Sequence, residues 1–354
     1  MFEVLSLNMK QIYPALVVST MSSGKSTLIN AILGEELLPS SNLACTTKAV
    51  AVLDNDAKPQ YGLHLVDGEG RYYFREQVTI KTITELHKAG NVDEMIIEGD
   101  IRGIKNSQRA LLLVDTPGLN YCMDKSHEMI TKEVLDEYQK GLILYVMNAQ
   151  QIGTYDDSNA MKLIVKKIKD KPKFQVIFVI NKMDGIDPSK EKPDELVENC
   201  RKYIQEQGIE EPTLIPVSAG SALLFKKVIN RKALSLTETE DFERSYKRFK
   251  NSGYSLVDYV RMPGRRSGSE VLAIGSGKYT RAELYAALYN TGLPFLEKKI
   301  DEILANSSKV EEPQIKVKKS AETKARRAEQ QEKRAEMKAI KEKEKLEKKA
   351  EKAK

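Results

Sequence analysis

Short apolar runs and amphipathic segments alternate along most of the chain. The apolar runs are rich in β-branched residues, and several end at polar residues; we expect strands at 12–19, 108–118, 142–148, 174–184 and 213–220. Helix-periodic segments separate them at 25–34, 155–169 and 192–207. Because continuous apolar strands that alternate with amphipathic helices bury both faces of a sheet, this order predicts an α/β fold. The sheet should be mostly parallel, with helices on both faces.

The remaining segments have other patterns. Shorter strand-like runs at 48–53, 61–66, 71–75 and 94–98 surround an expected helix at 80–89. After residue 220 the pattern is mainly helical, and a Lys/Glu/Ala-rich tail follows. We therefore expect three parts: a nucleotide domain over residues 1–235, a helical extension over 236–306 and a charged tail over 307–354. The run "AIGSGKYT" at 273–280 resembles a phosphate loop only in part, and we interpret it as an ordinary loop.

Charge is concentrated at the C-terminal end. The 354-residue chain has a net charge of +6, whereas residues 316–354 alone contain 16 Lys and Arg against 8 Glu, a net charge of +8. The remainder is therefore at −2. The interleaved Glu and the faint heptad trace favour a solvated or weakly coiled-coil helix, or disorder, for the tail. Contact of the tail with anionic membranes or nucleic acid would be electrostatic and weak.

Other features limit the class of protein. No apolar run approaches the ~18 residues of a membrane span, and the first ten residues have no secretory pattern. The three cysteines lie far apart, which argues against a disulfide framework or a zinc site. We expect a cytoplasmic protein.

The stretch "STMSSGKST" between the first strand and the first helix is typical of a phosphate-binding loop. Backbone N–H groups of Ser22, Ser23 and Gly24, with the helix N-terminus, can cradle phosphates. Lys25 would reach the β- and γ-phosphates, Ser26 would bind Mg²⁺, and Thr27 completes the motif. Ser19 stands where the common motif has its first Gly. We expect Ser19 to close the strand instead of contacting phosphate.

Two further motifs follow buried strands. Asp115 begins "DTPG" and could hold Mg²⁺ through a water, while the N–H of Gly118 could contact the γ-phosphate. Alone, this motif could be a simple turn. In "NKMD", the Asp184 carboxylate can accept the N1–H and N2–H₂ of guanine, which adenine does not offer. Lys182 can lie along the base, and Asn181 can tie this loop to the phosphate loop.

Two weaker motifs complete the set. Ser218 and Ala219 follow the last expected strand and could offer a backbone N–H to guanine O6. Thr46 and Thr47 precede the second strand, and either could bind Mg²⁺ and orient water; we slightly favour Thr47. The five motifs in this order predict a GTPase domain that takes GTP and Mg²⁺.

Beyond these motifs, "STMSSGKSTLINAILGEELLPSSNLACTTKAV" and "LLLVDTPGLN" resemble the dynamin-like GTPases, especially the bacterial ones, over residues 12–220. The 67 residues between Thr47 and Asp115 fit the enlarged domain of that family. The resemblance implies that Ser22 positions the attacking water and a monovalent cation, K⁺ or Na⁺. It also implies homodimers across the nucleotide face that stimulate hydrolysis. Lys25, Ser22, Gly118 and the switch threonine, Thr46 or Thr47, would then be the catalytic residues.

Departures from the family pattern matter too. Met21 replaces the Gln that dynamin has before the loop Ser, and Leu119 follows "DTPG" where Ras-like proteins have a catalytic Gln. About ninety residues separate Gly220 from the tail, so we expect no full stalk.

Two functions therefore fit the sequence. The first is a dynamin-like GTPase stimulated by self-association. The second is a slow GTP-dependent switch or scaffold that holds a stalk-bearing or DNA-associated protein. A ribosome or nucleic-acid factor that uses the tail fits less well, because of the 67-residue spacing.

Overall fold

The computed structural model describes residues 12–39, 50–89, 91–105, 109–119, 125–187, 190–251, 255–256, 271–275 and 277–307. The chain divides into two units, residues 1–314 and 315–354, and every described residue belongs to the first. The expected tail therefore lies outside the described residues, apart from Ser307.

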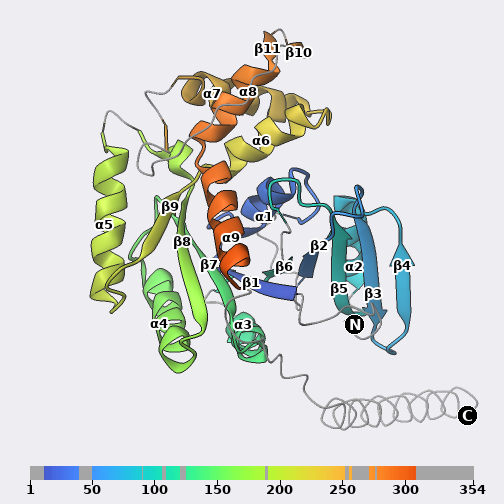
Figure 1. The fold of residues 1–354 in the computed structure, drawn as a ribbon, viewed down its shortest axis with the longest axis vertical. Helices are drawn as coiled ribbons and strands as arrows, with labels where there is room; N and C mark the ends of the chain where they lie inside the picture. The colour runs from blue at the N-terminus through green and yellow to red at the C-terminus, as the bar shows by residue number, and fades with distance from the viewer. Residues whose placement is uncertain are drawn as a thin grey trace, which may run out of the picture. The chain divides into compact units, whose positions relative to one another are not determined.

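One sheet of nine strands organises the described residues, in the order β4-β3-β5-β2-β6-β1-β7-β8-β9 (Figure 1). The strands are β1 (Ile12–Ser19), β2 (Val50–Asp54), β3 (Gly62–Asp67), β4 (Tyr72–Arg75), β5 (Val92–Gly99), β6 (Ala110–Asp115), β7 (Gly141–Asn148), β8 (Phe174–Asn181) and β9 (Thr213–Pro216). The α/β fold with a mostly parallel sheet is confirmed.

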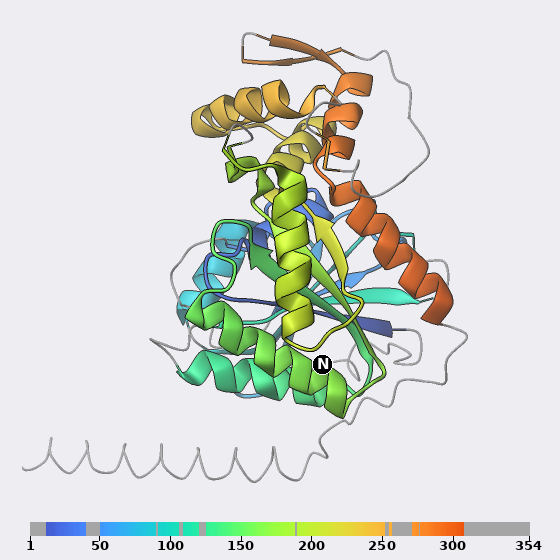
Figure 2. The same ribbon diagram turned by 90° about the vertical axis from the view of Figure 1, so that its left-hand side faces the viewer.

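Helices connect and cover these strands. They are α1 (Lys25–Leu33), α2 (Ile80–Ala89), α3 (Lys125–Glu137), α4 (Tyr155–Asp170), α5 (Pro193–Glu206), α6 (Ala219–Ile229), α7 (Leu236–Phe249), α8 (Arg281–Asn290) and α9 (Leu293–Ser307), with a 3₁₀ turn η2 (Met183–Gly185). Helices α3 and α4 lie on one side of the sheet and α9 on the other (Figure 2). The sequence analysis missed α3, which lies between β6 and β7.

The parallel half of the sheet is the core of the domain. Strand β1 lies between β6 and β7, and all eight of its residues are buried. Strands β8 and β9 extend the sheet beyond β7, again in parallel. Because all five strands run the same way, their carboxyl ends meet at one edge, where ligands bind in such sheets.

The other half of the sheet is mixed. Strand β2 runs antiparallel to β6 and parallel to β5, and β3 is antiparallel to both β5 and β4. Strand β4 is an edge strand, and Tyr72, Tyr73 and Phe74 on it are 40%, 45% and 45% exposed. These strands fall within the long spacing between Thr47 and Asp115 that the sequence analysis singled out.

The helical extension packs on α6 and α1. Helices α7 and α8 contact α6, and α9 contacts α8 and α1. Phe225 of α6 meets Phe242 and Phe249 of α7 edge to face, which buries all three rings. These contacts do not test the boundary that we placed at residue 235, which stays a prediction.

The prediction of an ordinary loop at 273–280 was wrong. Strands β10 (Val271–Ile274) and β11 (Gly277–Thr280) form an antiparallel hairpin there. Tyr279 of β11 packs against Phe242 and Tyr246, so aromatic contacts hold the hairpin on α7. These strands are short, and their period-2 pattern was too brief to recognise.

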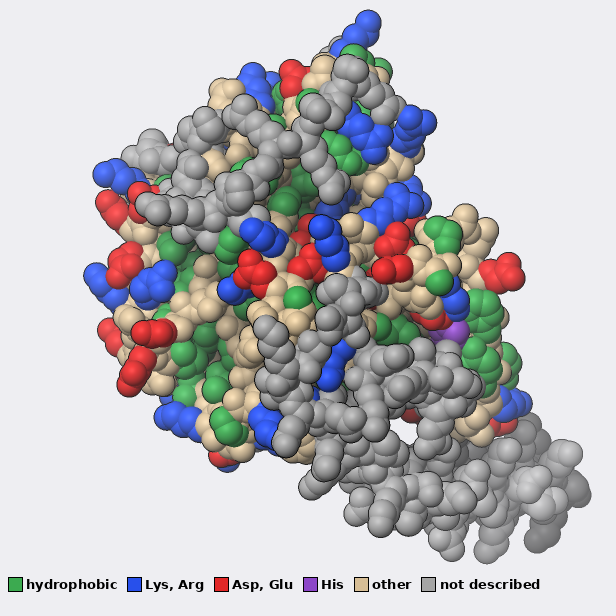
Figure 3. Space-filling view, viewed as in Figure 1, with side chains coloured by type: hydrophobic (Ala, Val, Ile, Leu, Met, Phe, Trp, Pro, Cys, Tyr) green, Lys and Arg blue, Asp and Glu red, His purple; other side chains and the backbone are tan. Residues whose placement is uncertain are grey.

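Two surface properties complete the description. Among the described residues, no helix combines the length and the apolar character needed to cross a bilayer. On the face shown in Figure 3, the coloured Lys and Arg side chains alternate with Asp and Glu, and no large patch of one sign appears.

Candidate nucleotide site

The phosphate loop joins β1 to α1 through two residues with positive φ. Ser19 ends β1, as expected, and Gly24 precedes α1 with φ 82° and ψ 30°. A Cβ on Gly24 would lie 2.5 Å from Nδ2 of Asn181. Conformation and space therefore both favour glycine at position 24. Ser22 also has a positive φ, of 60°, and is exposed, so its backbone adopts a sparsely populated conformation at the turn.

Internal hydrogen bonds hold this loop in shape. Ser23 is 1% exposed, and its hydroxyl donates to the Thr20 carbonyl oxygen at 3.0 Å. The hydroxyl groups of Thr20 and Ser23 also lie 2.9 Å apart. The start of the loop is therefore fixed before any phosphate arrives.

Lys25 and Ser26 converge on Asp115. The Lys25 ammonium group forms an ion pair with one carboxylate oxygen of Asp115, and the Ser26 hydroxyl donates to the other at 3.3 Å. Lys25 is 9% exposed. The structure thus brings together three residues that the sequence assigned to the phosphates and the metal, from two separate motifs.

These residues fit Mg²⁺. A hydroxyl and a carboxylate are the hard oxygen ligands that this ion prefers, and Mg²⁺ commonly keeps waters between itself and a carboxylate. Asp115 pairs with Lys25 here, so a bound metal would take over the carboxylate and a bound phosphate would take over the ammonium group.

The "DTPG" loop is bonded to the phosphate loop. Thr116 is buried, and its hydroxyl donates to the Val17 carbonyl at 2.8 Å. The N–H of Leu119 donates to Ser19 at 2.9 Å, and the N–H of Met21 donates to Leu119 at 3.2 Å. Leu119 is fully buried. Its side chain therefore faces the interior of the protein.

Helix α3 supports the same loop from the other side. The hydroxyl of buried Thr131 donates to the carbonyl oxygen of Pro117 at 3.1 Å. Gly118 lies against Met21, because a Cβ on Gly118 would be 3.4 Å from the Met21 Cα. The backbone around Gly118 is therefore placed beside the phosphate loop.

Asn181 connects three loops. Its Nδ2 donates to the carbonyl oxygens of Ser23 and Gly24 at 2.9 and 3.4 Å, and its Oδ1 accepts the Ala219 N–H at 3.1 Å. Asn181 is 2% exposed. The expected tie between the third motif and the phosphate loop is present in the structure.

Lys182 and Asp184 follow at the end of β8. Lys182 has a positive φ of 63° and begins the 3₁₀ turn that contains Asp184. Asp184 is half-buried, and within the described part of the chain no group donates a hydrogen bond to its carboxylate. An acceptor pair at the sheet edge is therefore available to a ligand.

Ser218 and Ala219 lie at the start of α6, beside Asn181. Both are buried, and both backbone N–H groups are bonded: that of Ser218 to Thr291 at 2.9 Å and that of Ala219 to Asn181. A base oxygen would therefore have to share the Ala219 donor with Asn181.

Three predicted residues remain, and the structure describes one of them. Thr46 and Thr47 lie outside the described residues, so the choice between them stays open. Thr27 belongs to the first turn of α1 and is half-buried. The roles assigned to all these residues remain predictions.

Three residues near the site were missed by the sequence analysis. Burial lowers the pKa of His87, and the charge of Asp115 opposes that shift. Within the described residues, the buried Nε2 of His87 has no hydrogen-bond partner. Thr291 and Gly292 meet the β9–α6 loop from the helical extension. A Gly after a helix and before "LP" indicates a helix end, but nothing local reveals its distant contact.

Known proteins resemble this chain mainly over the segment that carries the nucleotide motifs. Residues 16–183 match the model of the Dynamin family. A bacterial dynamin-like protein of Nostoc punctiforme is 28% identical over 213 residues, which cover 55% of this chain and 28% of the relative. The mitochondrial dynamin-like GTPase MGM1 of Chaetomium thermophilum is 30% identical over 185 residues, covering 49% and 19%. The chain spans less than a third of either relative.

A solved structure of an oligomerised bacterial dynamin pair, described with the sensing and tethering of membranes, aligns with a TM-score of 0.46 and 17% identity. The alignment covers 96% of this chain and 48% of that one. The match to the family model and the curated relatives confirm the resemblance expected from the motifs. Residues 16–183 of this chain therefore resemble the GTPase domain of the dynamin family.

Proposed function

We propose that this domain binds GTP and hydrolyses it, with Mg²⁺, to GDP and phosphate, and that self-association across the nucleotide face stimulates hydrolysis. The observation that carries the proposal is the position of Asn181. One buried amide bonds the phosphate loop on one side and the Ser218–Ala219 loop on the other. Asn181 thereby fixes the phosphate-binding loop and the base-binding loop relative to each other, as recognition of a whole nucleotide requires.

Each group has a task in this proposal. The N–H groups of Ser22, Ser23 and Gly24 and the start of α1 bind phosphate oxygens. Lys25 leaves Asp115 for the β- and γ-phosphates and stabilises the negative charge that develops in the transition state. Mg²⁺, held by Ser26 and indirectly by Asp115, neutralises phosphate charge when bound. Asp184 selects guanine, and Lys182 covers the base.

The water is activated by positioning in this proposal. Leu119 is apolar and buried, so its side chain cannot orient water. The exposed Ser22, the switch threonine at 46 or 47 and a monovalent cation would do so, as the family resemblance implies. A partner copy that orders these groups would raise the rate.

The buried Leu119 also favours the second candidate. A domain without a water-orienting side chain after "DTPG" can hydrolyse GTP slowly alone and act as a timed switch for a partner protein. The stalk-bearing or DNA-associated partner, the cytoplasmic location and the weak contacts of the tail remain proposals from the sequence.

One experiment separates the self-stimulated GTPase from the slow switch. It measures GTP turnover per molecule over a wide range of protein concentration, with Mg²⁺ and either K⁺ or Na⁺. A specific rate that climbs with concentration supports stimulation by self-association. A flat, slow rate favours the switch. No turnover and no preference for GTP over ATP would overturn both.

A further inference from the structure

The junction between α8 and α9 contacts the loop that we assign to the base. The N–H of Ser218 donates to the Thr291 carbonyl at 2.9 Å, and both residues are fully buried. Thr291 directly follows α8, and Gly292 directly precedes α9. The junction between these two helices therefore meets the residues that follow β9, at the end of the sheet.

Gly292 makes this contact too close for any other residue. Its φ is +78°, and a Cβ there would overlap the carbonyl oxygen of Pro216 and lie 3.5 Å from the Val217 Cα. The obstacle is backbone on the sheet side, which cannot rotate away as a side chain can. The position of the junction therefore sets the position of the loop from Pro216 to Ala219.

The junction is itself rigidly held. The Thr291 hydroxyl donates to the Leu288 carbonyl at 2.6 Å and accepts the Leu293 N–H at 3.4 Å, which links the two helices. Asn290 donates to the carbonyl of Phe249 at 2.7 Å, which ties the junction to the end of α7. A change in α7–α9 would reach Thr291 and Gly292 directly.

From the junction, hydrogen bonds continue to the phosphate loop. Thr291 binds Ser218, the next residue Ala219 donates to Asn181, and Asn181 binds Ser23. Every residue in this series is at most 2% exposed. Water cannot readily replace one link without disturbing the next.

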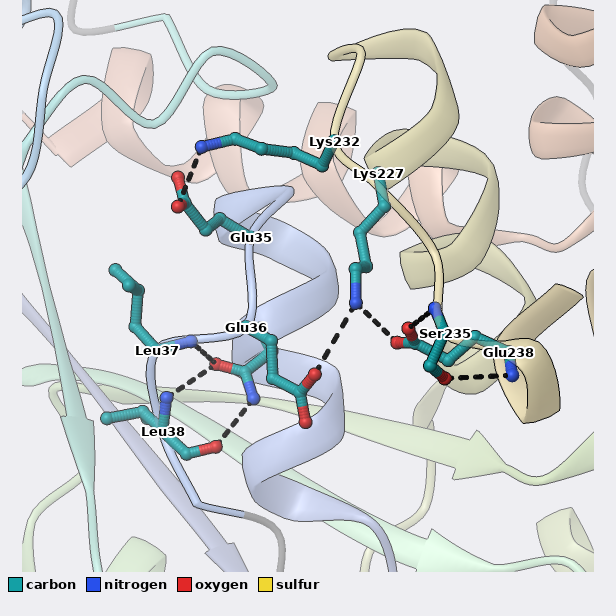
Figure 4. A network of polar contacts seen from close by, with 9 residues as sticks. Glu35, Glu36, Leu37, Leu38, Lys227, Lys232, Ser235 and Glu238 are labelled. Atoms are coloured by element: carbon teal, nitrogen blue, oxygen red, sulfur yellow. Dashed lines mark hydrogen bonds and ion pairs between the residues drawn. The ribbon is translucent and has the colours of Figure 1, made fainter. Parts of the chain in front are cut away.

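Helix α6 and the loop after it connect the extension to α1 and to the residues that follow α1. Lys226 of α6 pairs with the buried Glu297 of α9 and donates to the Ile32 carbonyl of α1 at 3.0 Å. Lys227 bridges Glu36 and Glu238, while Lys232 pairs with Glu35 at 2.8 Å (Figure 4). The amide of Asn30 on α1 also forms hydrogen bonds with the backbone of Leu37 and Leu38.

We propose that Thr291 and Gly292 are positioning residues for guanine recognition, so that the helical extension controls how well the loop from Pro216 to Ala219 holds the base oxygen O6. The inference rests on the proposed GTP binding. Coupling of this kind is reciprocal, so bound guanine nucleotide would also stabilise the present packing of α8 and α9.

The test uses the full chain, Mg²⁺ and three nucleotides. GTP is compared with 6-thio-GTP, which has a larger, poorer acceptor at O6, and with ITP, which lacks the 2-amino group read by Asp184. For Gly292→Ala we expect the preference for GTP over 6-thio-GTP to fall about tenfold, the effect of one misplaced hydrogen bond. The preference for GTP over ITP should stay as in the wild type, because Asp184 lies on another loop.

Gly208→Ala is the matched control. Gly208 also has a positive φ, of +96°, but a Cβ there meets only the Lys169 ammonium at 3.7 Å. Its preferences should equal those of the wild type. If Gly292→Ala does not fold, Thr291→Ala takes its place, with a smaller loss of O6 preference in the same direction.

Unchanged O6 preference in the folded variants, or an equal loss of both preferences, would overturn the inference. These outcomes differ from a failure of the proposed function, in which the wild-type chain itself would show no preference for guanine nucleotides over ATP.

Discussion

The two halves of the sheet use buried polar side chains differently. In the parallel half, Asp115 and Asn181 are the last residues of β6 and β8, so they project into the loops at the carboxyl edge. In the mixed half, His64 and Glu98 lie within β3 and β5 and are satisfied by each other at 2.7 Å. Polar groups at strand ends can change partners when a ligand arrives, whereas polar groups inside strands hold the fold.

The polar cluster of the mixed half is complete in itself. Glu98, 5% exposed, accepts hydrogen bonds from Asn55 at 2.6 Å and from Lys58, in addition to His64. Burial raises the pKa of Glu98, but these three hydrogen bonds outweigh burial and lower it. The other ring nitrogen of His64 lies 2.8 Å from the Tyr72 hydroxyl, which satisfies the neutral ring on both sides.

The largest effect should come from Lys25→Ala in the parallel half. Loss of the ammonium group removes charge stabilisation from the transition state, and we expect GTP turnover to fall on the order of 10³-fold. Single-turnover hydrolysis measures this loss, and the exposed Lys202→Ala on α5 should leave turnover unchanged. Turnover of the Lys25 variant at the wild-type rate would show that the phosphates bind elsewhere.

Asp184→Asn should change which base is bound. Guanine presents two donors to this residue and needs two acceptors, but the Asn amide has one acceptor and one donor group. Xanthine presents one donor and one carbonyl oxygen, which match the amide. We expect the preference for GTP over xanthosine triphosphate to fall on the order of 100-fold. Competition binding measures both nucleotides. An unchanged ratio would contradict the assignment of Asp184 to guanine.

Residues at strand ends were the part of the site that the sequence could predict. Asp115 and Asn181 each follow an apolar run, so their location at the carboxyl edge required only the rule for parallel sheets. The pairing of Ser218 with Thr291 could not be found this way, because it joins two segments that are distant in sequence and carries no motif. Helix α3 was missed because its sequence is mostly polar and contains none of the motifs.

In the mixed half, Glu98→Ala should act on stability. It removes the acceptor shared by three donors and leaves His64 buried, and we expect the free energy of unfolding to fall by about 2 kcal/mol. Denaturant titration measures the loss, with turnover per folded molecule unchanged. Glu85→Ala is the control, because its 4.0 Å pair with Lys81 is exposed and should contribute under about 0.5 kcal/mol.

A smaller effect should appear in the dependence of stability on pH. Burial lowers the pKa of His64 below 6.5, against the raising effect of Glu98, so below pH 6.5 the unfolded chain binds this proton more readily than the folded one. Stability from this group is therefore full above that pH and is lost as pH falls. His64→Gln should flatten the unfolding free energy between pH 7 and pH 5 relative to the wild type.

His87 has a lowered pKa as well, so the flattening should be partial. The double variant His64→Gln, His87→Gln should flatten the pH dependence of the unfolding free energy further. A slope in the His64 variant as steep as in the wild type would mean that His64 does not titrate in this range.

The central place of β1 has a consequence for biosynthesis. Among the described strands this one is translated first, whereas its neighbours β6 and β7 end at Asp115 and Asn148. Both edges of β1 therefore stay unpaired until much of the domain has been translated, and such waiting strands are exposed to aggregation. A nascent chain halted before β7 should present β1 to chaperones, whereas one extended past Asn148 can enclose it.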